Sequence, residues 1–150
     1  MLKSIKSFFD NLAPVSEQSE TDKQHAIQLA VSVLLVEMSR MDGEVSEEEM
    51  SHISQLLNQF DLNQEEKLEL FALANEKLDH STDYYQFTSV VNKQFDQTRK
   101  IEIIEQLWQV AYADGDLNAH EEHYLRKIHS LIHVSHKDFM RTKHRAKNSH

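Results

Sequence analysis

The chain has 150 residues but only two glycines and one proline, a composition that favours an all-α domain over a sheet protein, whose turns need those residues. The absence of cysteine excludes disulfides, thiolate metal sites and cysteine nucleophiles. The formal net charge of −9 argues against nucleic acid as a partner, because phosphate binding requires a basic surface.

The first element expected is an amphipathic helix within residues 1–14. Its apolar residues recur at spacings of three and four and are Leu2, Ile5, Phe8, Phe9 and Leu12. This apolar face could dock on the protein's own core or on a partner, and its two lysines leave a membrane surface as the alternative. Pro14 ends the helix, and residues 15–23 are expected to be a polar linker.

A long helix is expected from about Asp22 to Met41, where the domain proper (24–143) begins. Gln28, Ser32 and Ser39 form one polar stripe, and apolar residues fill most of the remaining circumference, which predicts a central helix. Glu37 lies on the apolar side of this helix. A buried carboxylate has to be paired or coordinated, so Glu37 is a candidate ligand.

The remaining helices are predicted from their capping residues and their apolar spacing. They are expected to begin near Ser46, Asn63, Ser81 or Thr82, Thr98, Asn118 and Ser135. The apolar face of the helix after Asn63 is predicted to consist of Leu68, Phe71, Ala72 and Leu78. Residues 144–150 are expected to be a short basic tail.

The sequence contains an internal pseudo-repeat. A shift of seventy-two residues aligns 29–70 with 101–142, and it superimposes apolar positions as well as the caps Asn63 and Ser135. The shift also superimposes "MDGEVSEEE" (41–49) on "ADGDLNAHE" (113–121), which hold both glycines of the chain. The repeat therefore predicts two equivalent units of helix, acidic turn, helix, turn and helix.

The two acidic turns have two alternative explanations. In the first, glycine ends one helix and the following polar residues cap the next. In the second, each turn resembles the second half of an EF-hand loop, with Asp42 and Glu49 in one copy and Asp114 and Glu121 in the other. The first half of each loop lacks carboxylates, so a cation site would have to be assembled from both turns, with Glu37 as an internal ligand. Oxygen donors of this kind predict Ca²⁺ or Mg²⁺.

The segments "LLVEMSRMDGEVSEEEM" and "LWQVAYADGDLNAHEEHYLRKIHSLIHVSHKDF" resemble the TerB-like tellurite-resistance family, over roughly residues 24–143. The superfamily also contains the N-terminal domain of the membrane-anchored co-chaperone DjlA. The resemblance implies a bacterial protein with a single compact bundle of about seven to eight helices. It also implies a metal site at the matching acidic positions: Glu37, Asp42, Glu49, Asp114 and Glu121, with Glu44 and Asp116 as further donors.

The function expected is that of a non-enzymatic, cytoplasmic binding module with a protein partner, in the tellurite or general stress response. No apolar run is long enough to span a bilayer, and lysines interrupt any signal peptide at the start. One alternative is a membrane-peripheral scaffold or co-chaperone-like domain. Another is a hydrolase that uses paired carboxylates and a metal.

Overall fold

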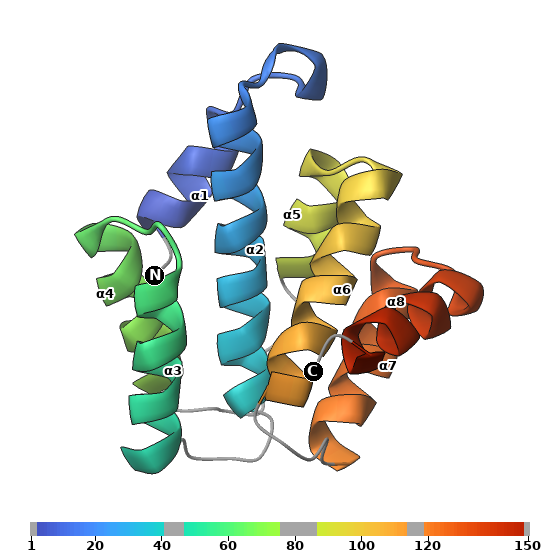
Figure 1. Cartoon of the computed structure of the whole chain (residues 1–150). Helices are drawn as coiled ribbons and strands as arrows, with labels where there is room; N and C mark the ends of the chain where they lie inside the picture. Colours follow the sequence, from blue (N-terminus) through green and yellow to red (C-terminus); the bar gives the residue numbers. More distant parts are fainter. Residues whose placement is uncertain (1–2, 41–46, 76–86, 114–118, 149–150) are drawn as a thin grey trace. The chain divides into compact units, whose positions relative to one another are not determined.

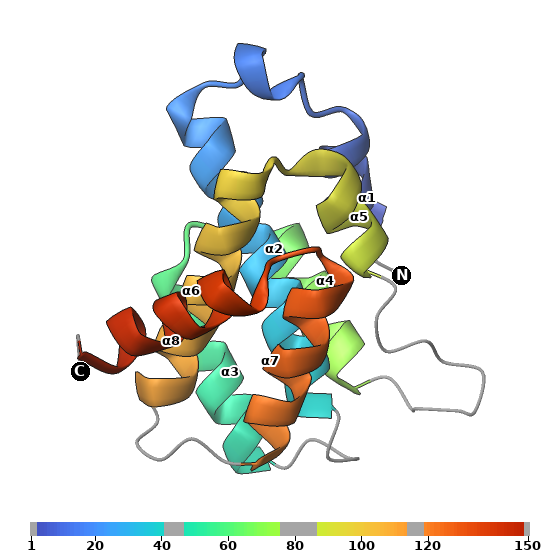
Figure 2. The same ribbon diagram turned by 90° about the vertical axis from the view of Figure 1, so that its right-hand side faces the viewer.

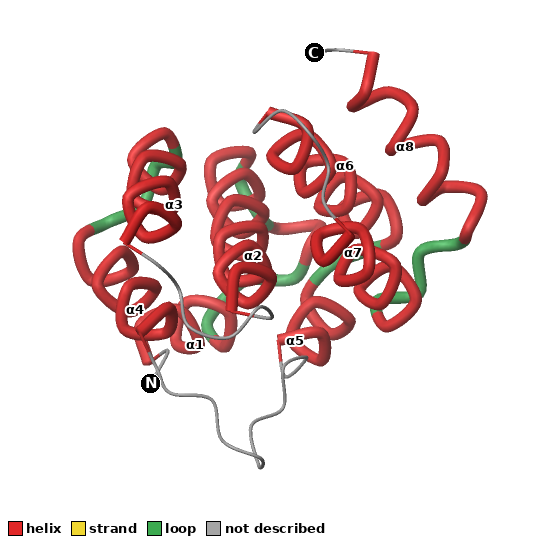
Figure 3. Tube along the Cα trace, turned by 90° about the horizontal axis from the view of Figure 1, so that it is seen from below, coloured by secondary structure: helices red, strands yellow, loops and turns green. Residues whose placement is uncertain are grey.

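The computed structural model describes residues 3–40, 47–75, 87–113 and 119–148 (Figure 1). In these residues every regular element is helical, which confirms the predicted all-α class (Figure 3). The elements are α1 (Lys3–Asp10), the 3-10 turn η1 (Val15–Glu17), α2 (Glu20–Arg40), α3 (Glu47–Gln59), α4 (Gln64–Asn75), α5 (Phe87–Gln94), α6 (Gln97–Ala113), α7 (Ala119–Leu131) and α8 (His136–Asn148).

The chain divides into two compact units. Unit 1 is Met1–Tyr84 and holds α1 to α4, whereas unit 2 is Tyr85–His150 and holds α5 to α8. The two copies of the predicted repeat fall one in each unit, since 29–70 lies in unit 1 and 101–142 in unit 2. The part of the chain expected to begin a helix at Ser81 or Thr82 lies outside the described residues, and α5 is described from Phe87.

The central helix of unit 1 is α2. The Ser19 hydroxyl accepts a hydrogen bond from the backbone N–H of Asp22 at 3.1 Å, so α2 begins at Glu20, within the expected linker. Every residue from 29 to 36 is buried, as expected for a helix that is apolar on most sides. The predicted polar stripe is wrong at Ser32, which is buried and donates its hydroxyl hydrogen to the Gln28 carbonyl oxygen at 2.7 Å.

The helix α4 packs against α2 with a different face from the one predicted. Leu68 is 57% exposed and Ala72 is also exposed, whereas Leu70 and Leu73 are buried. Phe71 is half-buried, and Leu78 lies outside the described residues. The reason is Glu66, which is 2% exposed because its carboxylate binds partners inside unit 1. The buried face of α4 therefore contains Glu66 beside Leu70 and Leu73.

The N-terminal helix α1 docks on α4 (Figure 1). Ile5 and Phe9 are buried, so the first of the two alternatives for its apolar face is the one observed. The helix ends at Asp10, before the expected stop at Pro14. Over the described part of the chain, no helix combines the length and the apolar character required to cross a membrane.

In unit 2, α6 packs against α7 and α8, and α8 crosses α6 (Figure 2). Asp96 caps α6 by accepting the backbone N–H of Arg99 at 2.9 Å. Residues 144–148, expected as a tail, continue α8 to Asn148. The guanidinium group of Arg145 forms an ion pair with Glu105 of α6 at 2.6 Å, and Ala146 is buried.

The helix boundaries of the two units confirm the repeat. A shift of seventy-two residues places the whole of α3 on α7 and the first residue of α4 on that of α8. The predicted caps are also observed. The side chain of Asn63 accepts the N–H of Glu66 at 2.8 Å, and that of Ser135 accepts the N–H of Asp138 at 3.1 Å.

Candidate functional site

The predicted metal ligands lie at the end of α2, at the starts of α3 and α7, and in the two Asp-Gly turns. The four ligands in the turns lie outside the described residues: Asp42, Glu44, Asp114 and Asp116. The structure places the other three, Glu37, Glu49 and Glu121, on helices that lead into or out of these turns.

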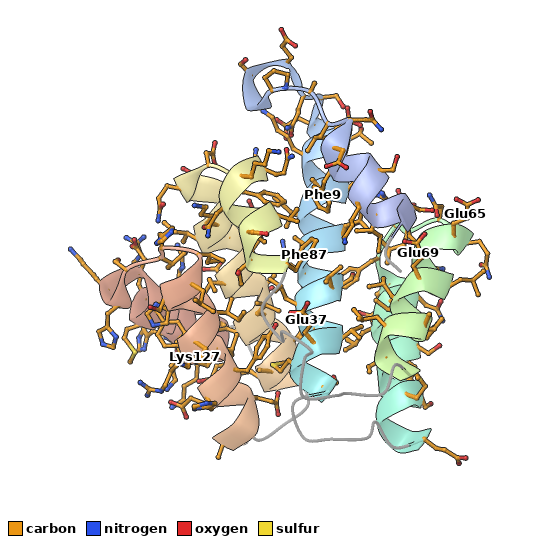
Figure 4. The ribbon with its side chains drawn as sticks, turned by 180° about the vertical axis from the view of Figure 1, so that it is seen from behind. Phe9, Glu37, Glu65, Glu69, Phe87 and Lys127 are labelled. Carbon is orange, nitrogen blue, oxygen red and sulfur yellow. The ribbon has the colours of Figure 1, made fainter. Side chains whose placement is uncertain are left out.

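Glu37 lies near the C-terminal end of α2, before the first turn (Figure 4). Its exposed fraction is 8%, which confirms the burial predicted from its position on the apolar side. The residue interacts with other groups of the chain. A buried carboxylate needs hydrogen-bond donors or positive charge around it, and Glu37 is therefore held in a defined position at the end of this helix.

Glu49 and Glu121 occupy equivalent positions, since each is the third residue of its helix. Glu121 is half-buried and interacts with other groups of the chain. A carboxylate in the first turn is stabilised by the positive end of the helix dipole. For Glu121 this interaction is compatible with both explanations of the turns, because it favours a capped helix and it also stabilises the ionised form of a candidate ligand.

In the stretches that the structure describes, no three His, Asp or Glu side chains are grouped so that they could hold a metal ion. The predicted site takes its aspartates from turns outside these stretches. Its shared assembly from both turns therefore stays a prediction, and capping remains the alternative.

A network of aromatic and charged side chains surrounds the end of α6, just before the second turn. The Lys143 ammonium lies 5.4 Å from the centroid of the buried Trp108 ring and 3.6 Å from the Glu122 carboxylate. Trp108 stacks on Tyr112 at 5.9 Å and packs against Phe139 at 4.9 Å between ring centroids. These contacts connect α6, α7 and α8 and fix the helices on both sides of the second turn.

This network shifts the pKa values of two of its members. The hydrogen bond from Arg126 lowers the pKa of Glu122, and the positive charge of Lys143 adds to that effect. Burial raises the pKa of Tyr112, and the negative charge of Glu122 raises it further. Sequence reasoning missed the network because its members come from three helices. The only signal was Trp108, the single tryptophan of the chain.

A second feature that the sequence did not reveal is an open groove in unit 1. It lies between α1 and the first turns of α2 and α4 and has a volume of about 670 Å³. Its lining is mixed, with the rings of Phe8 and His25 beside the carboxylates of Asp22, Glu65 and Glu66. The groove is therefore built by α1 with the residues just after it, and by the starts of α2 and α4.

Comparison with known proteins shows similarity to a described family. A family model described as "Tellurite resistance protein TerB" matches residues 28–144. The match includes all seven predicted metal ligands but excludes α1 and the first turns of α2. No curated protein and no solved structure matches the chain.

Proposed function

The chain belongs to the TerB family, and from this premise we propose that it is a non-enzymatic binding module whose two acidic Asp-Gly turns together bind one divalent cation. The ligands would be Glu37, Asp42, Glu49, Asp114 and Glu121, with Glu44 and Asp116 as further donors. An all-oxygen set of this kind suits Ca²⁺ or Mg²⁺.

The equivalence of the two turns carries this proposal. The helices that follow them, α3 and α7, have the same length and begin seventy-two residues apart, with Glu49 and Glu121 at the same helical position. Neither turn has the carboxylates of a complete EF-hand loop, so each supplies half of a ligand set. The buried Glu37 adds a further carboxyl group, five residues before Asp42 of the first turn.

Thermal unfolding tests the proposal. A cation that binds only the folded protein at a hundred times its Kd stabilises it by about 2.7 kcal/mol, which raises the Tm of a chain of this size by roughly 5–10 °C. We expect millimolar Ca²⁺ or Mg²⁺ to raise the Tm of the wild type. The increase should be lost in Glu49→Gln and in Glu121→Gln.

The matched control is Glu47→Gln, which removes an exposed carboxylate two residues before Glu49. We expect this variant to keep the cation response. No increase in Tm for the wild type, or an equal response in all four proteins, would contradict the cation site and leave capping as the role of the turns.

We further propose that the module acts in tellurite or general stress resistance through a protein partner. The family description supports this role. Growth on tellurite of a deletion strain carrying the wild-type gene or the Glu49→Gln/Glu121→Gln gene tests it. If both genes restore growth equally, the turns are not required for resistance.

A further inference from the structure

The helix α1 is attached to α4 through its own N-terminal end. The Glu69 carboxylate accepts the backbone N–H of Ser4 at 2.9 and 3.0 Å and that of Ile5 at 3.2 Å, and the Ser4 hydroxyl donates to Glu65 at 3.2 Å. The first N–H groups of a helix have no partner within the helix and carry its positive dipole end. Glu69 and Glu65 of α4, labelled in Figure 4, therefore recognise a helix by its N-terminus.

The apolar part of the attachment centres on two side chains of α1. Ile5 and Phe9 are buried, and Phe8 contacts the rings of Phe9 and His25 at centroid distances of 5.3 and 5.0 Å. The His25 ring is itself fixed by Glu66, at 2.9 Å between Nε2 and Oε2. Two buried anchors separated by one helical turn are the pattern by which an amphipathic helix binds a surface.

An open groove borders the site at which α1 docks. The helix has eight residues, and the groove of about 670 Å³ remains open between it and the starts of α2 and α4. Isolated helices shorter than about 12–15 residues are marginal in water, so α1 depends on docking for its structure. A terminal helix of only eight residues is among the segments expected to open locally without global unfolding.

We propose that the surface of α2 and α4 beneath α1 is a docking site for a cationic amphipathic helix of a partner protein, and that α1 occupies this site in cis. The charge of unit 1 indicates the class of partner, because the unit contains six Lys and Arg residues against seventeen Asp and Glu residues. Asp22, Glu65 and Glu69 bring part of this negative charge to the site. A partner helix with two apolar anchors, basic flanks and an uncapped N-terminus fits this site, because it matches the apolar contacts of α1, the negative charge of Asp22, Glu65 and Glu69, and the carboxylate that accepts the first N–H groups.

The test measures binding of a helix in trans to the full chain. In the variant Ile5→Glu/Phe9→Glu, α1 loses both anchors and leaves its site. The probe is a fluorescently labelled synthetic peptide with the sequence of residues 1–14, measured by anisotropy. We expect saturable binding to this variant and at least tenfold weaker binding to the wild type, in which α1 competes.

The recognition by Glu69 is tested in the same background. Adding Glu69→Lys to the double variant should weaken peptide binding at least tenfold. The matched control is Glu17→Lys, which makes the same change of charge at an exposed position and should alter binding less than twofold. Equal losses in both variants, or no saturable binding to the double variant, would overturn the proposal. Circular dichroism and Trp108 fluorescence show whether the variants are folded.

Cysteine labelling tests the opening of α1 without disturbing its charge, since the chain has no native cysteine. The thiol in Phe9→Cys should react at least a hundredfold faster than the thiol in Ala30→Cys, a buried position of α2. Equal rates would show that α1 opens only on global unfolding and would overturn the proposal, even if the double variant did not fold.

Two other occupants would be revealed by the same proteins. Flotation of the wild type with vesicles of phosphatidylcholine and phosphatidylglycerol, lost in the double variant, would assign α1 to a membrane surface. Concentration-dependent dimers of the wild type, absent from the double variant, would assign the site to α1 of a second copy. Either result would overturn the proposal of a partner helix.

Discussion

The helices that follow the acidic turns begin at equivalent positions in units 1 and 2, but the two units differ in charge. Unit 1 has six Lys and Arg residues against seventeen Asp and Glu residues, whereas unit 2 has ten against eight and contains seven of the ten histidines. Both units keep a capped corner between their last two helices, at Asn63 and at Ser135. The comparison shows that caps and apolar spacing set the boundaries, while the surface of the same scaffold is free to diverge.

The difference is clearest where α1 docks. Glu65 and Glu69 of α4 bind α1, and the residues seventy-two positions later are Lys137 and Arg141, both exposed on α8. Positive side chains cannot accept the N–H groups of a helix N-terminus. The first unit of the repeat can therefore receive a helix such as α1, and the equivalent face of the second cannot receive it in the same way.

Buried positions of α2 and α4 also differ from their equivalents in α6 and α8. Val33 and Leu73 are buried in unit 1, and the equivalent residues of unit 2, Glu105 and Arg145, form an ion pair at 2.6 Å. An apolar helix laid over this pair would have to remove its charges from water, which costs several kcal/mol per ion. Equivalent helix positions thus hold buried apolar side chains in unit 1 and an ion pair in unit 2.

The largest expected effect is a difference in stability loss. Substituting Trp108 should lower the free energy of unfolding more than substituting Val36, its equivalent in unit 1. Both are fully buried, but Trp108 contacts α8 through Phe139 and Lys143. We expect Trp108→Ala to lower the free energy of unfolding by about 3–5 kcal/mol and Val36→Ala by roughly 2 kcal/mol. Urea unfolding followed by circular dichroism measures both values, and a smaller loss for Trp108→Ala would contradict the importance of the network.

The second prediction compares Glu69 with Arg141. Glu69→Ala removes the acceptor of two backbone N–H groups of α1 and should lower the free energy of unfolding by about 1–2 kcal/mol, as for the loss of an N-cap. Arg141→Ala removes an exposed ion pair with Asp138 and should cost about 0.5 kcal/mol or less. Equal losses, measured by chemical unfolding, would show that the two faces do not differ in function.

Much of this comparison could be predicted from the sequence, because it depends on local signals. The caps at Asn63 and Ser135, the repeat, and the burial of α2 and of Glu37 follow from spacing within one or two helical turns. The inward position of Glu66 and the recognition of α1 by Glu69 could not be predicted. They join residues that are 41 and 65 positions apart in the sequence, and only tertiary packing brings them together.

The third prediction concerns the corners between the last two helices of each unit. His133 has a φ of 63° and stands between α7 and α8, where the Val134 N–H donates to the His129 carbonyl at 2.8 Å. This is the left-handed position that favours glycine. We therefore expect His133→Gly to raise the free energy of unfolding by about 0.5–1 kcal/mol. Asp61→Gly is the matched control at the equivalent corner of unit 1. This substitution should lower the free energy of unfolding, because the added glycine only increases the conformational freedom of the unfolded chain.

The smallest expected effect is the contribution of Glu122 in unit 2 to the pH dependence of stability. The equivalent residue of unit 1, Met50, carries no charge and makes no such contribution. Arg126 lowers the pKa of Glu122 in the folded protein, so folding favours the ionised form. The contribution is complete above the pKa of the unfolded chain, about 4.3, and is lost as the pH falls through the lower pKa of the folded state. A partly exposed pair of this kind contributes about 0.5 kcal/mol.

NMR titration of the Glu122 carboxyl group measures this effect. The pKa of Glu122 should rise towards its ordinary value in Arg126→Gln. It should be unchanged in the control Arg141→Gln, which removes an arginine paired with Asp138 instead. If both variants leave the titration of Glu122 unchanged, Arg126 is not the cause of its shift, and the charge network beside the second turn has to be assigned to Lys143 alone.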